Sequence, residues 1–435
     1  MATELIGLLS ILAIIALVLL RIPVAVAMGL VGTIGYVIID GWSAALNRLG
    51  NTPFELAEGY SFSVVPLFLL MGAVASRSGM SRDLFRAANG LFSGRRGTVA
   101  MAAVGACAGF GAICGSSLAT AATMSRIAIP EMRKLGYDER LAAGAVASGG
   151  TLGILIPPSV ILIVYAVIAQ ESVAQLFAAG LIPGLVLTAL HVVVIWALVT
   201  RRPALAPAAD RTLSWRERLR DVMAMWQMLV LFVISVGGIY AGVFSPTEAA
   251  AVGCLGAIVL GFATRRIGFA SVWASLGETV RTTAVLFFIV IMAFIYAYFL
   301  VLTRLPQNLV EFVTALGWSP LAVMLLVIAF YLVLGCFLDS IGMILITVPV
   351  FLPMVIGLGY DPVWFGILVV LVVEIGLITP PVGMNLFVIR AQQSDISIAT
   401  LYRGVLPFLS AGALLIALLL AFPNLALWLP RVLYG

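Results

Sequence analysis

Long apolar runs, separated by short polar and basic segments, make up most of the chain. A helix needs about 20 apolar residues to cross the hydrocarbon core of a bilayer. We predict spanning helices at 4–20, 23–39, 62–76, 141–169, 178–199, 224–242, 247–264, 282–301, 362–389 and 404–422. Two more apolar regions, about 97–135 and 318–356, are interrupted by Gly, Ser and Pro. We predict that each forms a re-entrant hairpin around a polar tip, because irregular backbone is tolerated at membrane depth only inside protein or beside a water-filled cavity.

The first apolar run has two interpretations. A cleaved signal peptide would have a basic start, a shorter apolar core and a small-residue cleavage site. Here the start is acidic, at Glu4, and the next apolar run begins at Pro23, soon after Arg21. We therefore predict a retained membrane helix.

The apolar pattern occurs twice, with a constant offset between the two copies. The tetrapeptide LGYD at 135–138 recurs at 358–361, and GILIPPS at 153–159 recurs at the same offset as GLITPPV at 376–382. Self-similarity at a fixed spacing indicates structural repeats. We predict a first repeat at 1–199 with a broken helix at about 141–169, a linker at 200–222, and a second repeat at 223–435 with a broken helix at about 362–389. The predicted fold class is an all-α polytopic membrane protein of two inverted repeats, each with five crossings and one re-entrant hairpin.

Composition and charge agree with this assignment. Hydrophobic residues make up 63% of the chain and charged residues 10%, whereas globular proteins carry about 25% charged residues. If the N-terminus faces the periplasm, 21 of the 24 Lys and Arg residues fall on the cytoplasmic side, and Arg48, Arg304 and Arg431 fall outside. Such an excess of positive charge inside is typical of membrane proteins. It explains the net charge of +5, which therefore gives no indication of nucleic-acid binding.

The hairpin tips carry the first candidate chemistry. Ser116 and Ser117 lie midway through the first hairpin, and Asp339 holds the place of Ser116 in the second. Small hydroxyl residues also serve close helix packing. Asp339 has two open interpretations, because a carboxylate at mid-membrane is a candidate ion or substrate ligand and an aspartate here also suits the N-cap of the second hairpin helix. Glu374, one turn before the second break, is a further buried acid that we rank lower, as a partner within the scaffold.

Two Pro-Pro pairs, at 157–158 and 380–381, predict breaks in the helices that contain them. Proline removes a backbone donor, so carbonyl oxygens in the preceding turn lose their partners. In inverted-repeat transporters such carbonyls bind Na⁺, and half-helix N-termini face anionic groups. A kink without a ligand is the alternative, but two breaks in register, each with a polar hairpin tip, favour ligand binding. The predicted Na⁺ ligands are Ser116, Ser117, Gly150, Thr151, Gly153 and Pro157 at one site and Gly335, Asp339, Gly376, Thr379 and Pro380 at the other, and the predicted substrate ligands are Ser116, Asp339, Thr379 and Asn385.

Other chemistry has little support in the sequence. The cysteines lie in apolar runs without metal-ligand spacing, as small packing residues do. The single histidine, His191, has no partner spaced for a proton relay. An HExxH motif or a cluster of acids, which would favour a membrane-embedded enzyme, is absent from the sequence. We predict that the chain is not an enzyme.

Four segments resemble one known family. They are GSSLATAATMSRIAIPEMRKLGY (115–137), GGTLGILIPPSVILIVYA (149–166), GCFLDSIGMILITVPVFLPM (335–354) and GLITPPVGMNLFV (376–388). They are similar to the large membrane subunit of tripartite ATP-independent periplasmic (TRAP) transporters, and the similarity covers nearly the whole chain. The resemblance implies an elevator-type ion-transporter fold in the bacterial inner membrane. It also implies symport of a small carboxylate driven by Na⁺, the coupling ion, at two or more sites.

The resemblance further implies two protein partners. A small four-helix membrane subunit, expected as a separate polypeptide, would complete the scaffold, and a periplasmic substrate-binding protein would deliver the substrate. The alternative function is a self-sufficient ion-coupled dicarboxylate symporter, which shares hairpins and broken helices but needs no soluble partner. Neighbouring genes for a four-helix protein and a signal-bearing binding protein would distinguish the two.

The distribution of basic residues predicts that both termini face the periplasm and that the 200–222 linker is cytoplasmic. A reporter that works only in the cytoplasm is expected to be active when fused after Arg211. A reporter that requires export is expected to be active at the C-terminus. Export of the reporter fused after Arg211 would contradict the inverted-repeat interpretation.

Overall fold

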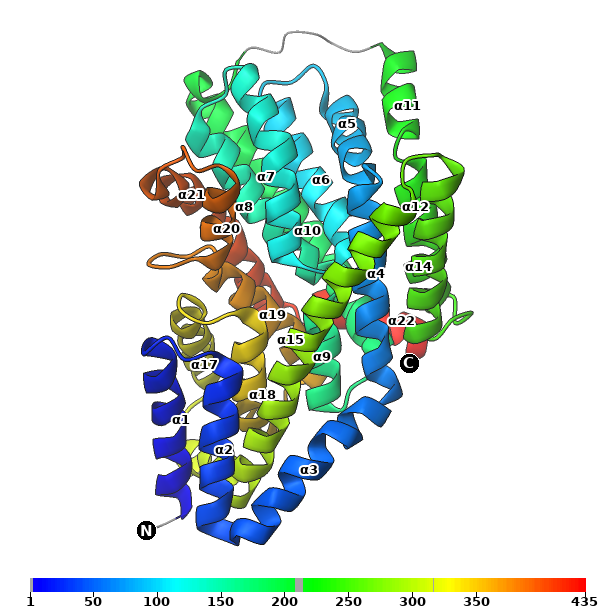
Figure 1. The fold of residues 1–435 in the computed structure, drawn as a ribbon. Coiled ribbons are helices and arrows are strands. Elements are labelled where there is room, and N and C mark those ends of the chain that lie inside the picture. The colour runs from blue at the N-terminus through cyan, green and yellow to red at the C-terminus, as the bar shows by residue number, and fades with distance from the viewer. Residues whose placement is uncertain (1–2, 208–213, 316) are drawn as a thin grey trace.

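The computed structural model describes residues 3–207, 214–315 and 317–435. Within these ranges the chain is helical, with irregular connections and no strand (Figure 1). Five helices are long and apolar enough to cross a membrane alone, and three bent pairs of shorter helices also qualify. The chain is therefore an all-helical polytopic membrane protein with bent and re-entrant helix pairs.

The helices of the first half follow in chain order. They are α1 (Thr3–Leu19), α2 (Val24–Asp40), α3 (Trp42–Glu58), η1 (Tyr60–Ser63), α4 (Val64–Arg77), α5 (Met80–Phe92), α6 (Thr98–Cys114), α7 (Ser117–Lys134), α8 (Glu139–Leu155), α9 (Val160–Ala169), α10 (Val173–Arg201) and η2 (Pro203–Leu205). The second half contains α11 (Trp215–Met223), α12 (Trp226–Phe232), η3 (Val233–Gly237), α13 (Gly238–Tyr240), α14 (Pro246–Ala263), α15 (Phe269–Leu302), α16 (Leu305–Ala315), α17 (Pro320–Gly335), α18 (Ser340–Gly357), α19 (Pro362–Gly376), α20 (Met384–Gln392), α21 (Ile398–Ala421) and α22 (Asn424–Tyr434).

Corresponding helices are related by the same offset as the repeated sequence motifs. Helices α7 and α18 keep this offset at both ends, and α8 and α19 keep it at their first residues. Their capping is equivalent too, since Asp138 accepts a hydrogen bond at the start of α8 and Asp361 does so at the start of α19. An N-cap side chain of this kind satisfies a backbone N–H that has no partner within the helix. The same local chemistry thus sets equivalent helix boundaries in both halves.

Two antiparallel helix pairs approach the middle of the molecule from opposite ends. The α6–α7 pair occupies the upper half of Figure 1, and the α17–α18 pair the lower half. Beside them, α8 and α9 are bent by 41° where the chain passes through the first Pro-Pro pair, and residues 377–383 separate α19 from α20 at the second. Both Pro-Pro peptide bonds are cis.

Several helices differ from the predicted spans. The predicted span 282–301 is the second part of a 34-residue helix, α15, and the predicted span 224–242 is divided by the π-helical turn η3. Helices α3, α5, α16 and α22 lie outside the predicted spans because polar residues interrupt their apolar pattern. The predicted linker is partly helical, since α10 reaches Arg201 and α11 begins at Trp215, whereas Arg211 lies outside the described residues.

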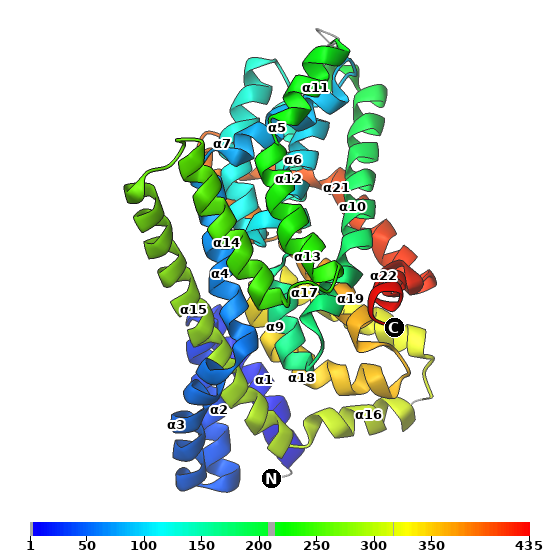
Figure 2. The ribbon, with the colours of Figure 1, turned by 90° about the vertical axis from the view of Figure 1, so that its right-hand side faces the viewer.

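The long helix α15 packs along a glycine face of α2. A Cβ atom at Gly32 would lie 2.9 Å from the Cα atom of Tyr296, and one at Gly35 would lie 2.3 Å from the ring of Phe299. The absence of side chains at these glycines lets the two helices approach closely, as small residues do in membrane proteins. Figure 2 shows α15 along one side of the molecule and α10 with α22 on the other.

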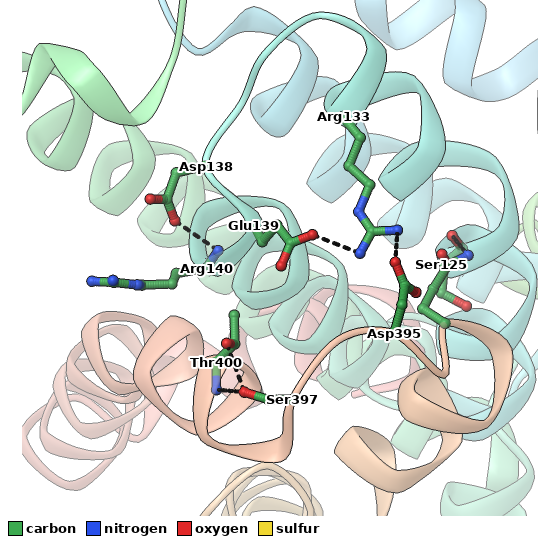
Figure 3. A network of polar contacts seen from close by, with 9 residues as sticks. Ser125, Arg133, Asp138, Glu139, Arg140, Asp395, Ser397 and Thr400 are labelled. Carbon is green, nitrogen blue, oxygen red and sulfur yellow. Dashed lines mark hydrogen bonds and ion pairs between the residues drawn. The ribbon is translucent and has the colours of Figure 1, made fainter.

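A polar network joins the base of the α6–α7 pair to the α20–α21 loop (Figure 3). The Arg133 guanidinium lies 2.7 Å from the Glu139 carboxylate and 2.6 Å from that of Asp395. The hydrogen bond from Arg133 lowers the pKa of Asp395, so the pair stays ionised at neutral pH. Gln393 adds a hydrogen bond of 3.2 Å to the carbonyl of Ser125. The α20–α21 loop of the second half is therefore connected to α7 of the first half.

The tightest backbone contact between the halves generates a stability prediction. A Cβ atom at Gly144 in α8 would lie 2.1 Å from the carbonyl oxygen of Gly404 in α21. We expect Gly144→Ala to lower the free energy of unfolding by about 1–3 kcal/mol, the usual cost of overpacking, and to lower the thermal unfolding midpoint. The control is Gly277→Ala, where a Cβ atom meets nothing within 4 Å. Equal midpoints for the two variants would contradict the packing described here.

Candidate functional site

The tips of both hairpins border one cavity of about 170 Å³ in the middle of the molecule. Its walls include residues from the first tip, the second tip and the second broken helix. The first tip contributes Ser116 and Ser117, and the second tip contributes Asp339 and Ser340. The second broken helix contributes Leu377 and Met384. Segments from the two halves of the chain, far apart in sequence, therefore meet around one small space.

The first tip is held by its own cap and by the first helix break. Gly115 has φ +63°, a left-handed conformation that reverses the chain between α6 and α7. Its carbonyl accepts a hydrogen bond of 3.3 Å from the backbone N–H of Val160, at the start of α9. Ser116 is the N-cap of α7, and its hydroxyl accepts a 3.3 Å hydrogen bond from the N–H of Ala119. The tip and the break are thus hydrogen-bonded to each other.

Glycines of α8 lie directly against this tip. A Cβ atom at Gly150 would lie 3.4 Å from the carbonyl oxygen of Ser117. One at Gly153 would lie 3.4 Å from the carbonyl oxygen of Ser116. Thr151 is buried and donates a 2.6 Å hydrogen bond to the carbonyl of Ser148 within α8.

Pro157 is buried at the break beside Pro158. A Cβ atom at Gly115 would lie 2.8 Å from the carbonyl oxygen of Pro158. The structure therefore brings Gly150 and Gly153 against the tip residues Ser116 and Ser117, whereas Thr151 bonds within α8 and Pro157 is next to Pro158 at the break.

The second tip has the same plan with a carboxylate in place of a hydroxyl. Asp339 is the N-cap of α18 and accepts a 2.9 Å hydrogen bond from the N–H of Gly342. Behind the tip, a Cβ atom at Gly376 would lie 2.7 Å from the Cα atom of Gly335. Asp339 both caps the helix and borders the cavity, so the two roles considered from the sequence are compatible in this geometry.

The remaining predicted residues of the second set lie around the second break. The Thr379 hydroxyl donates a 2.6 Å hydrogen bond to the carbonyl of Ile375, and neither Thr379 nor Pro380 lines the central cavity. Asn385 has 0% exposure, and both polar atoms of its amide are without a partner among the described residues. An unpaired buried amide costs free energy, and Asn385 lines neither this cavity nor the larger one beside the first tip.

Glu374 has a more central place than the sequence indicated. It is 2% exposed, in the last turn of α19, and its Oε1 atom accepts a 3.3 Å hydrogen bond from the Ser340 hydroxyl. Helix periodicity gives no information about this contact, because it joins two separate segments, α19 and the start of α18.

A second, larger cavity of about 510 Å³ adjoins the first tip. One wall is a face of α7, where Ser116, Thr123 and Arg126 lie at helical spacing. The opposite wall contains Arg77 and Glu278, whose side chains form an ion pair of 2.9 Å. Arg126 was not predicted as a site residue, although its position on the face of Ser116 was a signal available in the sequence.

Comparison with protein families supplies independent information. The family described as "Tripartite ATP-independent periplasmic transporter, DctM component" matches residues 11–425. The C4-dicarboxylate TRAP transporter large permease protein DctM of Pseudomonas aeruginosa is 41% identical over 380 residues, which cover 87% of this chain and 88% of that protein. The sialic acid TRAP transporter large permease protein SiaM of Vibrio cholerae is 33% identical. That match covers 90% of this chain and 91% of SiaM.

A longer relative and two solved structures complete the comparison. The isethionate TRAP transporter permease protein DctMQ of Oleidesulfovibrio alaskensis is 31% identical over 94% of this chain, but the match covers 63% of that protein. The crystal structure of the Alcanivorax borkumensis YdaH transporter superposes with a TM-score of 0.64 at 17% identity, covering 90% of each chain. Neisseria gonorrhoeae MtrF gives 0.60 at 18% identity, covering 88% of this chain and 85% of that one. At these identities the two structures show likeness of fold.

Proposed function

Because the chain belongs to the DctM component family of tripartite ATP-independent periplasmic transporters, we propose that it carries a small carboxylate across the bacterial inner membrane by sodium-driven symport. As a transporter permease it is not an enzyme. Relatives named for C4-dicarboxylates and for sialic acid support a carboxylate substrate. The family name supports a periplasmic binding protein that delivers it.

The second partner in the proposal is a small four-helix membrane subunit. The DctMQ relative is longer than the matched region, which covers 63% of it. We assign the additional length of that relative to a fused small subunit. We propose that the protein described here works with such a subunit.

The observation that carries the proposal is the meeting of two capped hairpin tips with two broken helices around one cavity. In transporters built from inverted repeats, such half-helices and unwound segments hold the substrate and the coupling ions. Carbonyl and hydroxyl oxygens are the hard ligands that suit Na⁺, and both are present at the first tip. We therefore retain the two predicted sets as the Na⁺ sites, the first around Ser116 and the second around Asp339.

The substrate would lie beside these ions. Ser116 and Asp339 border the central cavity, and Asn385 offers an unpaired buried amide. The adjoining cavity presents Arg126, a guanidinium that suits a carboxylate. Substrate release toward the cytoplasm through this second cavity follows from the proposed orientation.

We propose an inverted-repeat elevator as the mechanism. The equivalent spacing of α7 with α18 and of α8 with α19 supports the repeats, and the opposite approach of the two hairpins supports the inversion (Figure 1). The Arg133–Asp395 pair and the Gly144–Gly404 contact join parts of both repeats. These joined elements would move as one body against α2 and α15.

The overall proposal is tested by uptake in proteoliposomes that contain the chain with its binding protein and small subunit. We expect uptake of a radiolabelled C4-dicarboxylate or sialic acid when an inward sodium gradient is imposed, and none with an equal potassium gradient. Uptake that needs no binding protein would overturn the tripartite assignment and favour the self-sufficient symporter. Uptake without any ion gradient would overturn the sodium coupling.

The two sets of ion ligands give a separate prediction. Ser116→Ala and Thr379→Ala each remove one oxygen, so we expect weaker ion binding by about 1–3 kcal/mol, the scale of an unsatisfied buried polar group. The measurement is the sodium concentration for half-maximal uptake, which should rise in both variants. Ser125→Ala is the control, because Ser125 belongs to neither set of predicted ligands and its hydroxyl bonds to the carbonyl of Ala122. Unchanged sodium dependence in both variants would assign these residues to packing alone.

A further inference from the structure

A basic surface cavity of about 400 Å³ lies where the α5–α6 loop meets the end of α10. The loop contributes Arg95 and Arg96, and the end of α10 contributes Trp196 and Thr200, followed by Pro203 of η2. This cavity shares no lining residue with the two cavities of the candidate site. The proposed ion and substrate sites therefore give it no role.

Two glycines shape the loop that carries the arginines. Gly94 and Gly97, on either side of them, have φ values of +87° and +81°, a left-handed conformation that favours glycine. The Thr98 hydroxyl donates a 2.9 Å hydrogen bond to the carbonyl of Phe92 across the loop. A Cβ atom at Gly97 would lie 3.2 Å from a methyl carbon of Val199 in α10. The local backbone therefore holds both arginines beside α10.

The positive charge of this cavity is not paired with an acid among the described residues. Neither Arg95 nor Arg96 belongs to an ion pair there, and neither do Arg201 and Arg202, which lie in the chain between the lining residues of α10 and η2. Arg133, by contrast, contacts two carboxylates. Guanidinium groups bind phosphate oxygens in pairs of parallel hydrogen bonds. The cavity is thus suited to a phosphate group.

An apolar strip on α10 runs along the helix to this cavity. Leu185, Val193 and Trp196 are 55%, 53% and 58% exposed, and their helical spacing places them on one face. Helix α10 is long and apolar enough to cross a membrane, so the strip is suited to contact lipid chains. Tryptophan is enriched where the membrane meets water, and Trp196 lies between the strip and the arginines. The strip and the cavity together match the apolar chains and the charged headgroup of a phospholipid.

We propose that this cavity binds the phosphate headgroup of an anionic phospholipid of the cytoplasmic leaflet, with the acyl chains along the α10 strip. Basic pockets between membrane helices on the cytoplasmic side bind such headgroups. The predicted orientation places Arg95 and Arg96 on that side. A lipid is favoured over free phosphate because it also covers the apolar strip. This lipid site depends neither on the proposed sodium coupling nor on the transported substrate.

The test measures the thermal unfolding midpoint of the purified full-length chain in detergent micelles as dioleoyl phosphatidylglycerol is added. A ligand that binds the folded state raises this midpoint. We expect a saturable rise with this anionic lipid and little rise with dioleoyl phosphatidylcholine, which has no net charge. For Arg95→Gln/Arg96→Gln we expect a half-saturating concentration higher by about tenfold or more, because each arginine adds to the attraction of anionic headgroups.

The control for charge is Arg390→Gln/Arg403→Gln. It removes the same charge from two exposed arginines that line none of the cavities described, so the response to the lipid should persist. Trp196→Ala tests the apolar strip and should weaken the response even if the variant of the cavity arginines fails to fold. Its control is Trp273→Ala, which removes a 78% exposed tryptophan from α15.

Three outcomes would overturn the lipid site. Equal responses of the two arginine variants, or of the two tryptophan variants, would show that the lipid acts on the surface in general. An equal rise with inorganic phosphate at constant ionic strength, lost in Arg95→Gln/Arg96→Gln, would assign the cavity to a free anion. Loss of the lipid response when the small membrane subunit is bound would show that a protein covers this face.

Discussion

Interrupted helices expose backbone polar groups in the middle of an apolar molecule, and the rest of the structure depends on how these groups are satisfied. In hydrocarbon each unpaired group costs several kcal/mol. At the first tip, the carbonyl of Gly115 is paired with the N–H of Val160, so the hairpin and the helix break satisfy each other. At both tips an N-cap side chain, Ser116 or Asp339, pairs with an N–H of the first turn. Both capping residues also border the central cavity, where ions and substrate are the partners in the function proposed here.

Close backbone approach is the second requirement, and glycine supplies it in both halves. A Cβ atom at Gly111 would lie 2.1 Å from the Cα atom of Gly153, and one at Gly376 would lie 2.7 Å from that of Gly335. Contacts this close leave little room for a hairpin to slide along its broken helix. A large movement of these elements is more readily accommodated at other helix contacts, where side chains hold the backbones further apart. This reasoning favours movement of hairpins and broken helices as one body.

The sequence was informative where a local rule sets the structure. The Pro-Pro pairs predicted the interruptions between α8 and α9 and between α19 and α20, because proline acts on its own turn. The constant offset between the repeated motifs predicted which segments are equivalent. Helices such as α3 and α22 were missed because their polar residues hide the apolar pattern, and the length of α15 was missed because its first part carries polar residues. The contact of Glu374 with Ser340 was not predictable, since no local rule relates α19 to the tip of another helix pair.

Two of the differences between the repeats place a carboxylate near the second hairpin tip. Ser116 corresponds to Asp339, and Thr151 corresponds to Glu374, so both exchanges put the acid in the second half. A symmetric pair of carboxylates on each side would bring four negative charges close together without enough cations to offset them, which is costly at mid-membrane. In the second half, the N-terminus of α18 offsets part of the negative charge, because Asp339 caps this helix and Glu374 accepts a hydrogen bond from Ser340 in its first turn. The second half thus supplies the charge and the first half supplies neutral oxygens, and in the function proposed here a ligand between the tips would interact with both.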